Sequence, residues 1–262
     1  MGSWITSEIG NIAVVTFTRP PRNFMSFEAL GELADRLEAL KDREDISVIM
    51  LTSGLPGYFI AHADLEDLDR AGRGEPIKGE RTSWRTTPAL IETMPQPVIA
   101  AINGQAWGGG TELSLACTFR IVSQSSSFGL PEVAVGLIPA AGSTQRLPPI
   151  VGLGRALEMI LSGRKIQADE ALSIGLANAV FPDEGFAEAA LKWAQQIVQH
   201  HRPALAAAKR AILDGVRLPF DEGMMLEREL AMPRTKDPVS LEARKLLNRR
   251  YAETPPHVVV EF

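Results

Sequence analysis

The sequence predicts an α/β protein whose C-terminal part is helical. Short apolar segments rich in β-branched residues, typical of buried strands, alternate with helical patterns through the first half of the chain. In the last third, nearly all apolar residues recur at helical spacing. We therefore expect an α/β core over residues 1–200 and a helical part over residues 201–262, with the boundary near His200–Pro203.

The N-terminal part reads as two strands with a helix between them. Residues 12–18 and 47–52 are the strands, and each is stopped by a turn signal, prolines 20 and 21 or Ser53-Gly54. Ser26 fits the N-cap position of the helix, and leucines follow at helical spacing, at positions 30, 33, 37 and 40. A charged helix comes after residue 65, and glycines and charges in residues 70–81 predict a mobile loop.

A strand over residues 97–103 leads into a glycine-rich junction, residues 106–114, which reads Ala-Trp-Gly-Gly-Gly-Thr-Glu-Leu-Ser. Apolar residues up to Cys117 indicate that a buried helix follows. The first turn of such a helix presents unpaired N–H groups and the positive end of the helix dipole. Glu112 lies in that turn, so a carboxylate and free donors face one small volume, which suits holding an oxyanion and moving a proton. Close packing and dipole compensation alone would explain the same residues.

Residues 119–123 form a further predicted strand, and a serine-rich turn then brings the chain to Glu132. A solvated loop glutamate is the default expectation there. Beyond residue 137 the pattern is helical, over residues 155–161, 168–172, 184–200, 203–213 and 221–252.

Composition excludes several classes of function. The net charge is −5 with no long basic block, so neither nucleic acid nor an anionic membrane is an expected partner. Cys117 is the single cysteine, and the histidines at positions 62, 200, 201 and 257 lack ligand spacing, so no disulfide and no metal site are expected. The N-terminus does not read as a signal peptide, and no apolar stretch would span a bilayer, so we expect a cytoplasmic protein.

The common nucleophile and nucleotide motifs are missing as well. The sequence has no Gly-x-Ser-x-Gly elbow and no Walker A motif. Residues 152–157 lack the third glycine of a dinucleotide-binding fingerprint. What remains is the pair of carboxylates, Glu112 and Glu132, and two small-residue turns that follow strands, at residues 61–63 and 108–110.

Three spaced motifs resemble the enoyl-CoA hydratase/isomerase (crotonase) family. They are Ile-Ala-His-Ala-Asp-Leu at residues 60–65, Asn-Gly-Gln-Ala-Trp-Gly-Gly-Gly-Thr-Glu-Leu at 103–113, and the segment from Phe128 to Leu147. Residues 17–23 and 168–176 support the match, which runs from about residue 12 to residue 182. Several motifs in the right order are far more specific than any one of them.

The resemblance implies a spiral of repeated ββα units and a C-terminal helical part that packs against neighbouring subunits. It implies a homo-trimer or a hexamer built from two trimers. The substrate would be an acyl-CoA thioester, so coenzyme A is part of the substrate and no separate cofactor is implied.

The resemblance also assigns the chemistry. The backbone N–H groups that hold the thioester oxygen map to Ala61 and Gly109, and the two glutamates of the hydratase branch map to Glu112 and Glu132. Glu132 would exchange the proton at Cα, while Glu112 would orient and activate the water. Adjacent carboxylates titrate as a pair, so either one can hold the proton.

Further positions map to substrate binding. The adenine of coenzyme A would lie near Ala63, Asp64 and Leu65, with basic help from the segment containing Arg22. The N–H of Ala140, where the family often has glycine, would position the water. Beside Gly108, the ring of Trp107, and more weakly that of Trp84, would line the acyl pocket or belong to the core.

The chain departs from the family at four places. His62 stands where glycine is usual, directly after the first oxyanion-hole residue, and its imidazole would narrow the pocket or add a donor. Thr118 replaces a common aspartate, and Ser143 replaces a glycine. Residues 246–262 do not resemble the usual ending, so no contact to coenzyme A carries over from them.

Hydration of a 2-enoyl-CoA ester is the reaction that this pattern favours. Three alternatives stay open: double-bond isomerisation, hydrolysis or lysis of a C–C bond in an acyl-CoA, and noncatalytic binding of an acyl-CoA or a protein partner. Retention of both glutamates argues against the last, because a binding module needs no paired carboxylates beside an oxyanion hole.

Overall fold

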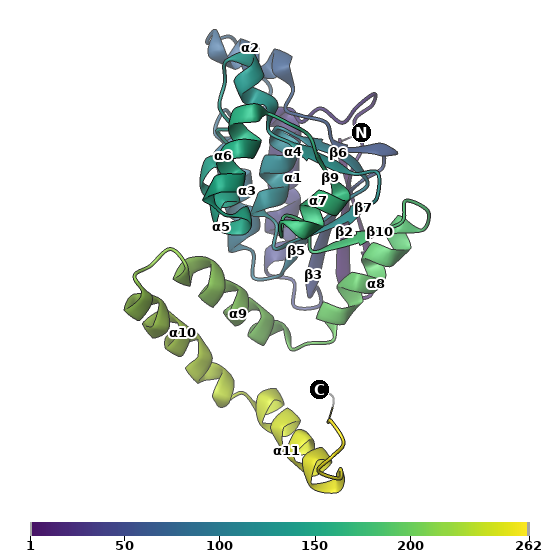
Figure 1. The fold of residues 1–262 in the computed structure, drawn as a ribbon, viewed down its shortest axis with the longest axis vertical. Helices are drawn as coiled ribbons and strands as arrows, with labels where there is room; N and C mark the ends of the chain where they lie inside the picture. Colours follow the sequence, from purple (N-terminus) through teal and green to yellow (C-terminus); the bar gives the residue numbers. More distant parts are fainter. Residues whose placement is uncertain (1, 261–262) are drawn as a thin grey trace. The chain divides into compact units, whose positions relative to one another are not determined.

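The computed structural model describes residues 2–260 and contains two compact units, divided between Gln199 and His200 (Figure 1). The first unit holds two β-sheets and the helices that cover them. The second unit is made of helices.

The larger sheet has six strands in the order β1-β2-β3-β5-β7-β10, and the smaller has four in the order β4-β6-β8-β9. The larger sheet contains β1 (Trp4–Ile9), β2 (Ile12–Phe17), β3 (Val48–Ser53), β5 (Val98–Ile102), β7 (Phe119–Ser123) and β10 (Ala179–Phe181). The smaller contains β4 (Gly57–Ile60), β6 (Gly104–Trp107), β8 (Ser127–Gly129) and β9 (Ile166–Gln167).

Successive pairs of strands pass from one sheet to the other. β3, β5 and β7 lie parallel in the larger sheet, and the strands that directly follow them, β4, β6 and β8, lie parallel in the smaller one. Helices then return the chain to the larger sheet. This is the repeated ββα arrangement that the resemblance to the crotonase family implies.

The helices of the first unit are α1 (Phe27–Lys41), α2 (Leu65–Gly72), α3 (Ser83–Thr93), α4 (Gly109–Ala116), α5 (Ser143–Val151), α6 (Leu153–Ser162), α7 (Ala168–Ser173) and α8 (Phe186–Val198), with a 3₁₀ helix η1 (Pro131–Val135). The second unit contains α9 (Arg202–Gly215), α10 (Phe220–Thr235) and α11 (Pro238–Glu253).

Two apolar clusters hold the first unit together. α8 packs on one face of the larger sheet, where Phe186 and Ala190 join sheet residues such as Ile12 and Val48. The main core lies on the other face and contains the leucines of α1, which are fully buried as their helical spacing predicts. Ser26 caps that helix as expected, because its hydroxyl accepts the Ala29 N–H at 3.1 Å.

The local pattern missed or misplaced several elements. No bounds were predicted for the short strands β4, β6 and β8, because three or four residues are too few to show a period. The loop expected from Arg70 begins later, since α2 continues to Gly72. The helical tail over residues 221–252 is broken before Pro238, where the Asp237 side chain caps a new helix by accepting the N–H groups of Val239 and Ser240.

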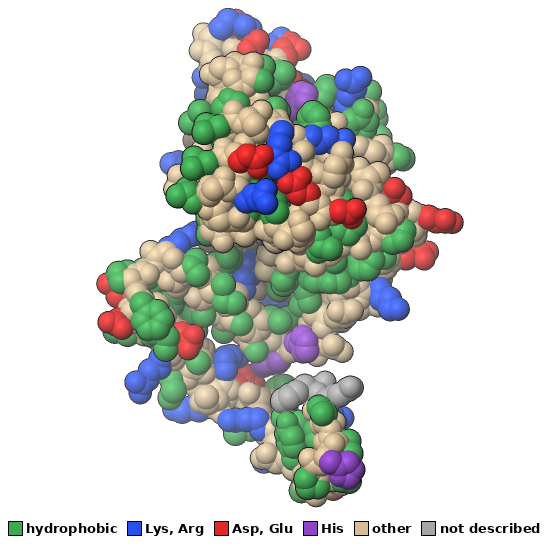
Figure 2. Space-filling view, in the orientation of Figure 1, with side chains coloured by type: hydrophobic (Ala, Val, Ile, Leu, Met, Phe, Trp, Pro, Cys, Tyr) green, Lys and Arg blue, Asp and Glu red, His purple; other side chains and the backbone are tan. Residues whose placement is uncertain are grey.

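Opposite charges interleave on the face over α6 and α7 (Figure 2). Arg164 lies between Glu158 of α6 and Glu170 of α7 and pairs with both. The Cys117 thiol is buried as expected. Within residues 2–260, no helix is both long enough and apolar enough to cross a bilayer.

Candidate active site

The start of α4 lies against the end of β4. Gly108 ends the β6 turn with φ 49° and ψ −121°, a backbone conformation that side chains disfavour, and it caps α4. A Cβ atom on Gly110 would overlap the Ile60 carbonyl, so the two backbones touch here. This contact brings Ala61, the residue after β4, into the neighbourhood of Gly109.

Two buried backbone N–H groups lie at this junction. Gly109 is the first residue of α4, so its N–H has no intrahelical acceptor. Ala61 is only 1% exposed. Outside the hydrogen bonds of the helices and strands, neither N–H has a backbone acceptor within residues 2–260. Buried unpaired donors are costly, and a ligand oxygen would satisfy both.

Trp84 of α3 covers the helix N-terminus. A Cβ atom on Gly109 would overlap the indole Cη2 and stand 2.7 Å from Cζ3. Trp107 instead lies against Gly129, and its Nε1 donates to Ser127 Oγ at 3.2 Å. Of the two tryptophans, the one that the sequence rated lower is therefore the one that contacts the candidate oxyanion site.

Glu112 is buried on the first turn of α4, with 6% of its surface exposed. Its Oε1 accepts the backbone N–H of Ala141 at 2.7 Å. Burial and then the nearby charge of Glu132 raise its pKa to about 7, against the opposing effect of hydrogen bonds from the backbone of Ala141 and Ser143 and the charge of Arg146. Glu112 can therefore gain or lose a proton near neutral pH.

Glu132 is presented by η1 on the other side of Gly108. A Cβ atom on Gly108 would stand 3.0 Å from its Oε1, while its Oε2 is buried without a hydrogen-bond partner in the described part of the chain. Burial raises the pKa of this carboxyl, although its own backbone N–H opposes the shift. An unpartnered acid oxygen of this kind is free for a ligand or a water molecule. The structure thus brings together both glutamates that the sequence singled out.

The predicted coenzyme A turn is held by an ion pair that the sequence did not identify. Asp64 caps α2, and its Oδ2 accepts Arg19 Nη1 at 2.8 Å. Burial would raise the pKa of Asp64, but the hydrogen bonds from Arg19 and from the first turn of α2 lower it overall. Ala63 and Leu65 flank this cap, while Arg22, which follows Arg19 closely in the sequence, is exposed.

Ala140 is exposed, and the N–H that contacts Glu112 belongs to the next residue, Ala141. His62 lies at the glycine turn, with its Cβ 3.6 Å from the position a Cβ on Gly108 would take. Its ring stacks on Phe24 at 4.3 Å and 24°, and its Nδ1 donates to the Ala63 carbonyl at 2.6 Å. The imidazole is thus fixed in place.

Sequence reasoning also missed the residues behind Glu112. Arg146 of α5 pairs with Glu92 of α3 through two contacts, Nε to Oε1 at 2.8 Å and Nη2 to Oε2 at 3.1 Å. Arg146 lies inside the last quoted motif and could have been found there. Glu92 has no local signal, since it reaches Arg146 only across the fold.

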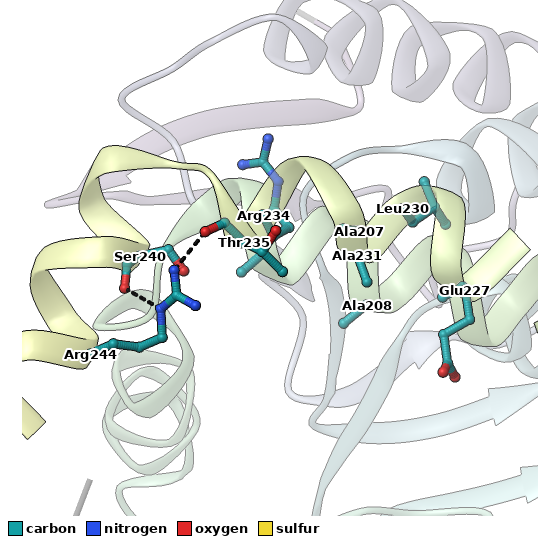
Figure 3. A pocket seen from close by; sticks show the side chains of 11 residues that line it. Ala207, Ala208, Glu227, Leu230, Ala231, Arg234, Thr235, Ser240 and Arg244 are labelled. Carbon is teal, nitrogen blue, oxygen red and sulfur yellow. Dashed lines mark hydrogen bonds between the residues drawn. The ribbon is translucent and has the colours of Figure 1, made fainter. Parts of the chain in front are cut away.

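A different groove, of about 420 Å³, lies within the C-terminal unit (Figure 3). Its floor is rich in alanines of α9 and α10, and Arg244 donates there to the carbonyls of Thr235 at 2.5 Å and Ser240 at 3.1 Å. Glu227 is the one acid of its lining. Nor do residues 2–260 contain a group of three or more His, Cys, Asp or Glu that could hold a metal. The acid pair at α4 is thus the stronger candidate for chemistry.

Comparison with known proteins agrees with this geometry. The family model described as enoyl-CoA hydratase/isomerase matches residues 7–253, which extends the likeness into α11, beyond the quoted motifs and into the ending that seemed to depart from the family. A short-chain-enoyl-CoA hydratase of Clostridium acetobutylicum is 34% identical over 230 residues, covering 86% of each chain. A glyoxysomal fatty acid beta-oxidation multifunctional protein of Cucumis sativus is 38% identical over 200 residues, but the chain spans only 27% of that protein's length.

The fold is also that of a solved relative. The crystal structure of an enoyl-CoA hydratase from Bacillus anthracis superposes with a TM-score of 0.87 and 35% identity, covering 95% of this chain and 96% of that one. This likeness confirms the predicted fold class. The family model matches this ββα spiral almost end to end, and Glu112 and Glu132 both lie close to the glycine-rich start of α4. The chain is therefore an enzyme of the enoyl-CoA hydratase/isomerase family.

Proposed function

We propose that the protein adds water across the 2,3-double bond of a 2-enoyl-CoA thioester. The observation that carries the proposal is the acid pair beside the start of α4, made of the buried Glu112 and the half-buried Glu132, whose Oε2 is buried without a hydrogen-bond partner. The names of the relatives support hydration as the reaction and leave the acyl group open.

The two backbone N–H groups suit the charge that hydration creates. Attack at Cβ moves negative charge onto the thioester oxygen, and the N–H groups of Ala61 and Gly109 would bind that oxygen. One such donor typically contributes about 3–4 kcal/mol to transition-state stabilisation. The N-terminal end of α4 adds favourable dipole interaction with the same charge.

The two acids divide the proton transfers. Glu112, as the carboxylate, takes a proton from water while the water oxygen bonds to Cβ. Glu132, as the acid, delivers a proton to Cα, so the pair ends with its proton moved from one carboxyl to the other and water added across the bond. Burial raises the pKa of both carboxyls, and the charge of Glu132 raises that of Glu112 further, which favours a pair that holds one proton near neutrality.

The remaining predicted residues would bind the substrate. We place the adenine near Ala63, Asp64 and Leu65, with Arg22 available to the phosphates, and let the Ala140 N–H position the water. Gly108 and Trp107 would flank the acyl group. None of these roles calls for a cofactor or a metal.

We further propose that the C-terminal unit mediates a homo-trimer or hexamer and that the enzyme acts in the cytoplasm. Large apolar side chains on this unit are exposed, including Phe220 at 80% and Met225 at 72%. Exposed apolar groups of this size favour burial in an oligomer.

The test is to add purified protein to crotonyl-CoA and follow the loss of the conjugated thioester absorbance. The Glu112→Gln and Glu132→Gln variants are assayed in the same way. Rapid loss in the wild type that falls at least about 100-fold in each variant supports hydration by the pair. Turnover of a 3-enoyl ester that survives Glu112→Ala would point to isomerisation, which needs one proton shuttle. Tight binding of CoA esters without turnover would make the protein a noncatalytic relative.

A further inference from the structure

We propose that the ion pair of Arg146 and Glu92 is a positioning device that fixes the Glu112 carboxylate through the turn at Ala141. The inference rests on the proposed function, because it assigns the pair a task in placing the base of the hydration reaction.

The pair is strong and mostly shielded from water. Arg146 engages Glu92 with two parallel bonds, at 2.8 and 3.1 Å, and the two side chains are 15% and 13% exposed. Bidentate pairing of this kind fixes the guanidinium plane as well as its position. Lysine would offer no such fork, so Arg146 is held in one orientation.

The third nitrogen of the guanidinium contacts the turn beside Glu112. Arg146 Nη1 donates to the Ala141 carbonyl at 2.7 Å. The N–H of the same residue donates to Glu112 Oε1 at 2.7 Å. Ala141 is therefore held on one side by Arg146 and holds Glu112 on the other.

The chain of contacts joins three helices that meet only in the folded protein. Glu92 lies one residue before the end of α3, Arg146 lies in the first turn of α5, and Glu112 lies in the first turn of α4. Each link is a charged or backbone hydrogen bond. The geometry thus connects the position of the base to the packing of α3 against its neighbours.

The pair also acts through charge. Arg146 favours the carboxylate form of Glu112 and opposes the effect of burial on its pKa. Removing Arg146 would loosen the turn and favour the protonated form of Glu112. Both changes reduce the fraction of enzyme in which the Glu112 carboxylate is ionised and correctly positioned. We therefore expect kcat to fall while substrate binding is largely kept.

The experiment compares Arg146→Met, Arg146→Lys and Glu92→Gln with Arg164→Met, a matched control in the exposed ion pairs over α6 and α7. With crotonyl-CoA, kcat should fall about 10–100-fold in Arg146→Met, with KM within about threefold. The kcat of Arg146→Lys and of Glu92→Gln should fall less, and that of Arg164→Met should stay within about twofold of the wild-type value. The acidic limb of the kcat profile should move to higher pH in Arg146→Met.

A double variant tests whether the effect passes through Glu112. Arg146→Met should cost little in a Glu112→Gln background, because the base that it positions is already gone. Equal losses in both backgrounds, or a wild-type kcat in Arg146→Met, would overturn the inference. If Arg146→Met does not fold, as judged by circular dichroism, the Arg146→Lys and Glu92→Gln variants decide by the same criteria.

Inactivity of the wild type toward enoyl-CoA esters would reject the proposed function by itself. The inference is then decided by NMR titration of the ¹³C-labelled glutamate carboxyls. A Glu112 pKa that is higher in Arg146→Met than in the wild type supports it, and an unchanged one overturns it.

Discussion

The indole of Trp84 lies against the backbone of Gly109, so closely that a Cβ atom on Gly109 would overlap the ring. Helix α3 thereby covers the N-terminus of α4 at Gly109, whose N–H has no acceptor within the helix. Glycine at this position is required by the contact, since the left-handed backbone of the turn belongs to Gly108.

We expect Gly109→Ala to lower kcat/KM for crotonyl-CoA by at least about 100-fold, because the added methyl group displaces either the ring or the N–H donor. Trp84→Ala in the same chain removes the overlap and should recover part of the activity. Steady-state kinetics of the two single variants and the double variant measure this. Full activity in Gly109→Ala would exclude its N–H from the oxyanion hole.

The rate should depend on pH through the acid pair. Because the pKa of Glu112 is raised to about 7 and its carboxylate is the proposed base, kcat/KM should rise about tenfold per pH unit below 7 and level off above it. A rate that is flat from pH 5 to pH 8 would contradict this assignment, whereas the Glu112→Gln variant should lack the rise.

Stability should depend on pH in the opposite sense. Burial raises the pKa of folded Glu112 from 4.5 to about 7, so the folded state favours the protonated acid. The contribution of Glu112 to stability is therefore complete below pH 4.5 and is lost as the pH rises through 7. Gln carries no such penalty, so Glu112→Gln should be more stable than the wild type at pH 8, by about 1–3 kcal/mol, with little difference at pH 4.5. Urea unfolding at the two pH values checks this. A difference that is equal at both would show that ionisation of Glu112 carries no cost in the fold.

Arg22 should affect binding alone. Arg22 is an exposed cation that we propose binds the phosphates of coenzyme A. Replacing it by alanine should raise KM about three- to tenfold and leave kcat unchanged. The effect should weaken in high salt. Arg43→Ala, which removes a cation paired with Glu8 and Asp45 elsewhere, serves as the control. Equal KM values for the Arg22 and Arg43 variants would place the phosphates away from Arg22.

The sequence predicted those elements whose signals are local. The leucines of α1 bury one side of their helix by their spacing, whereas the short apolar runs of β2, β3, β5 and β7 indicate strands buried mostly on both faces. The positions of these elements agree with the structure to within a few residues. The motifs around the glycine turn also identified the family and the two glutamates. A period needs several residues to show, so the three- and four-residue strands of the smaller sheet carried no such signal.

By itself, the sequence determined the α/β class, the helical C-terminal part, the family, and the residue types that the candidate site holds. Only the tertiary structure decided which groups meet. The Ala141 N–H donates to Glu112, Arg19 pairs with Asp64, and Glu92 pairs with Arg146, which bonds to the turn at Ala141. Such contacts join residues up to 54 positions apart along the chain, and packing of separate helices fixes them, so no local pattern encodes them.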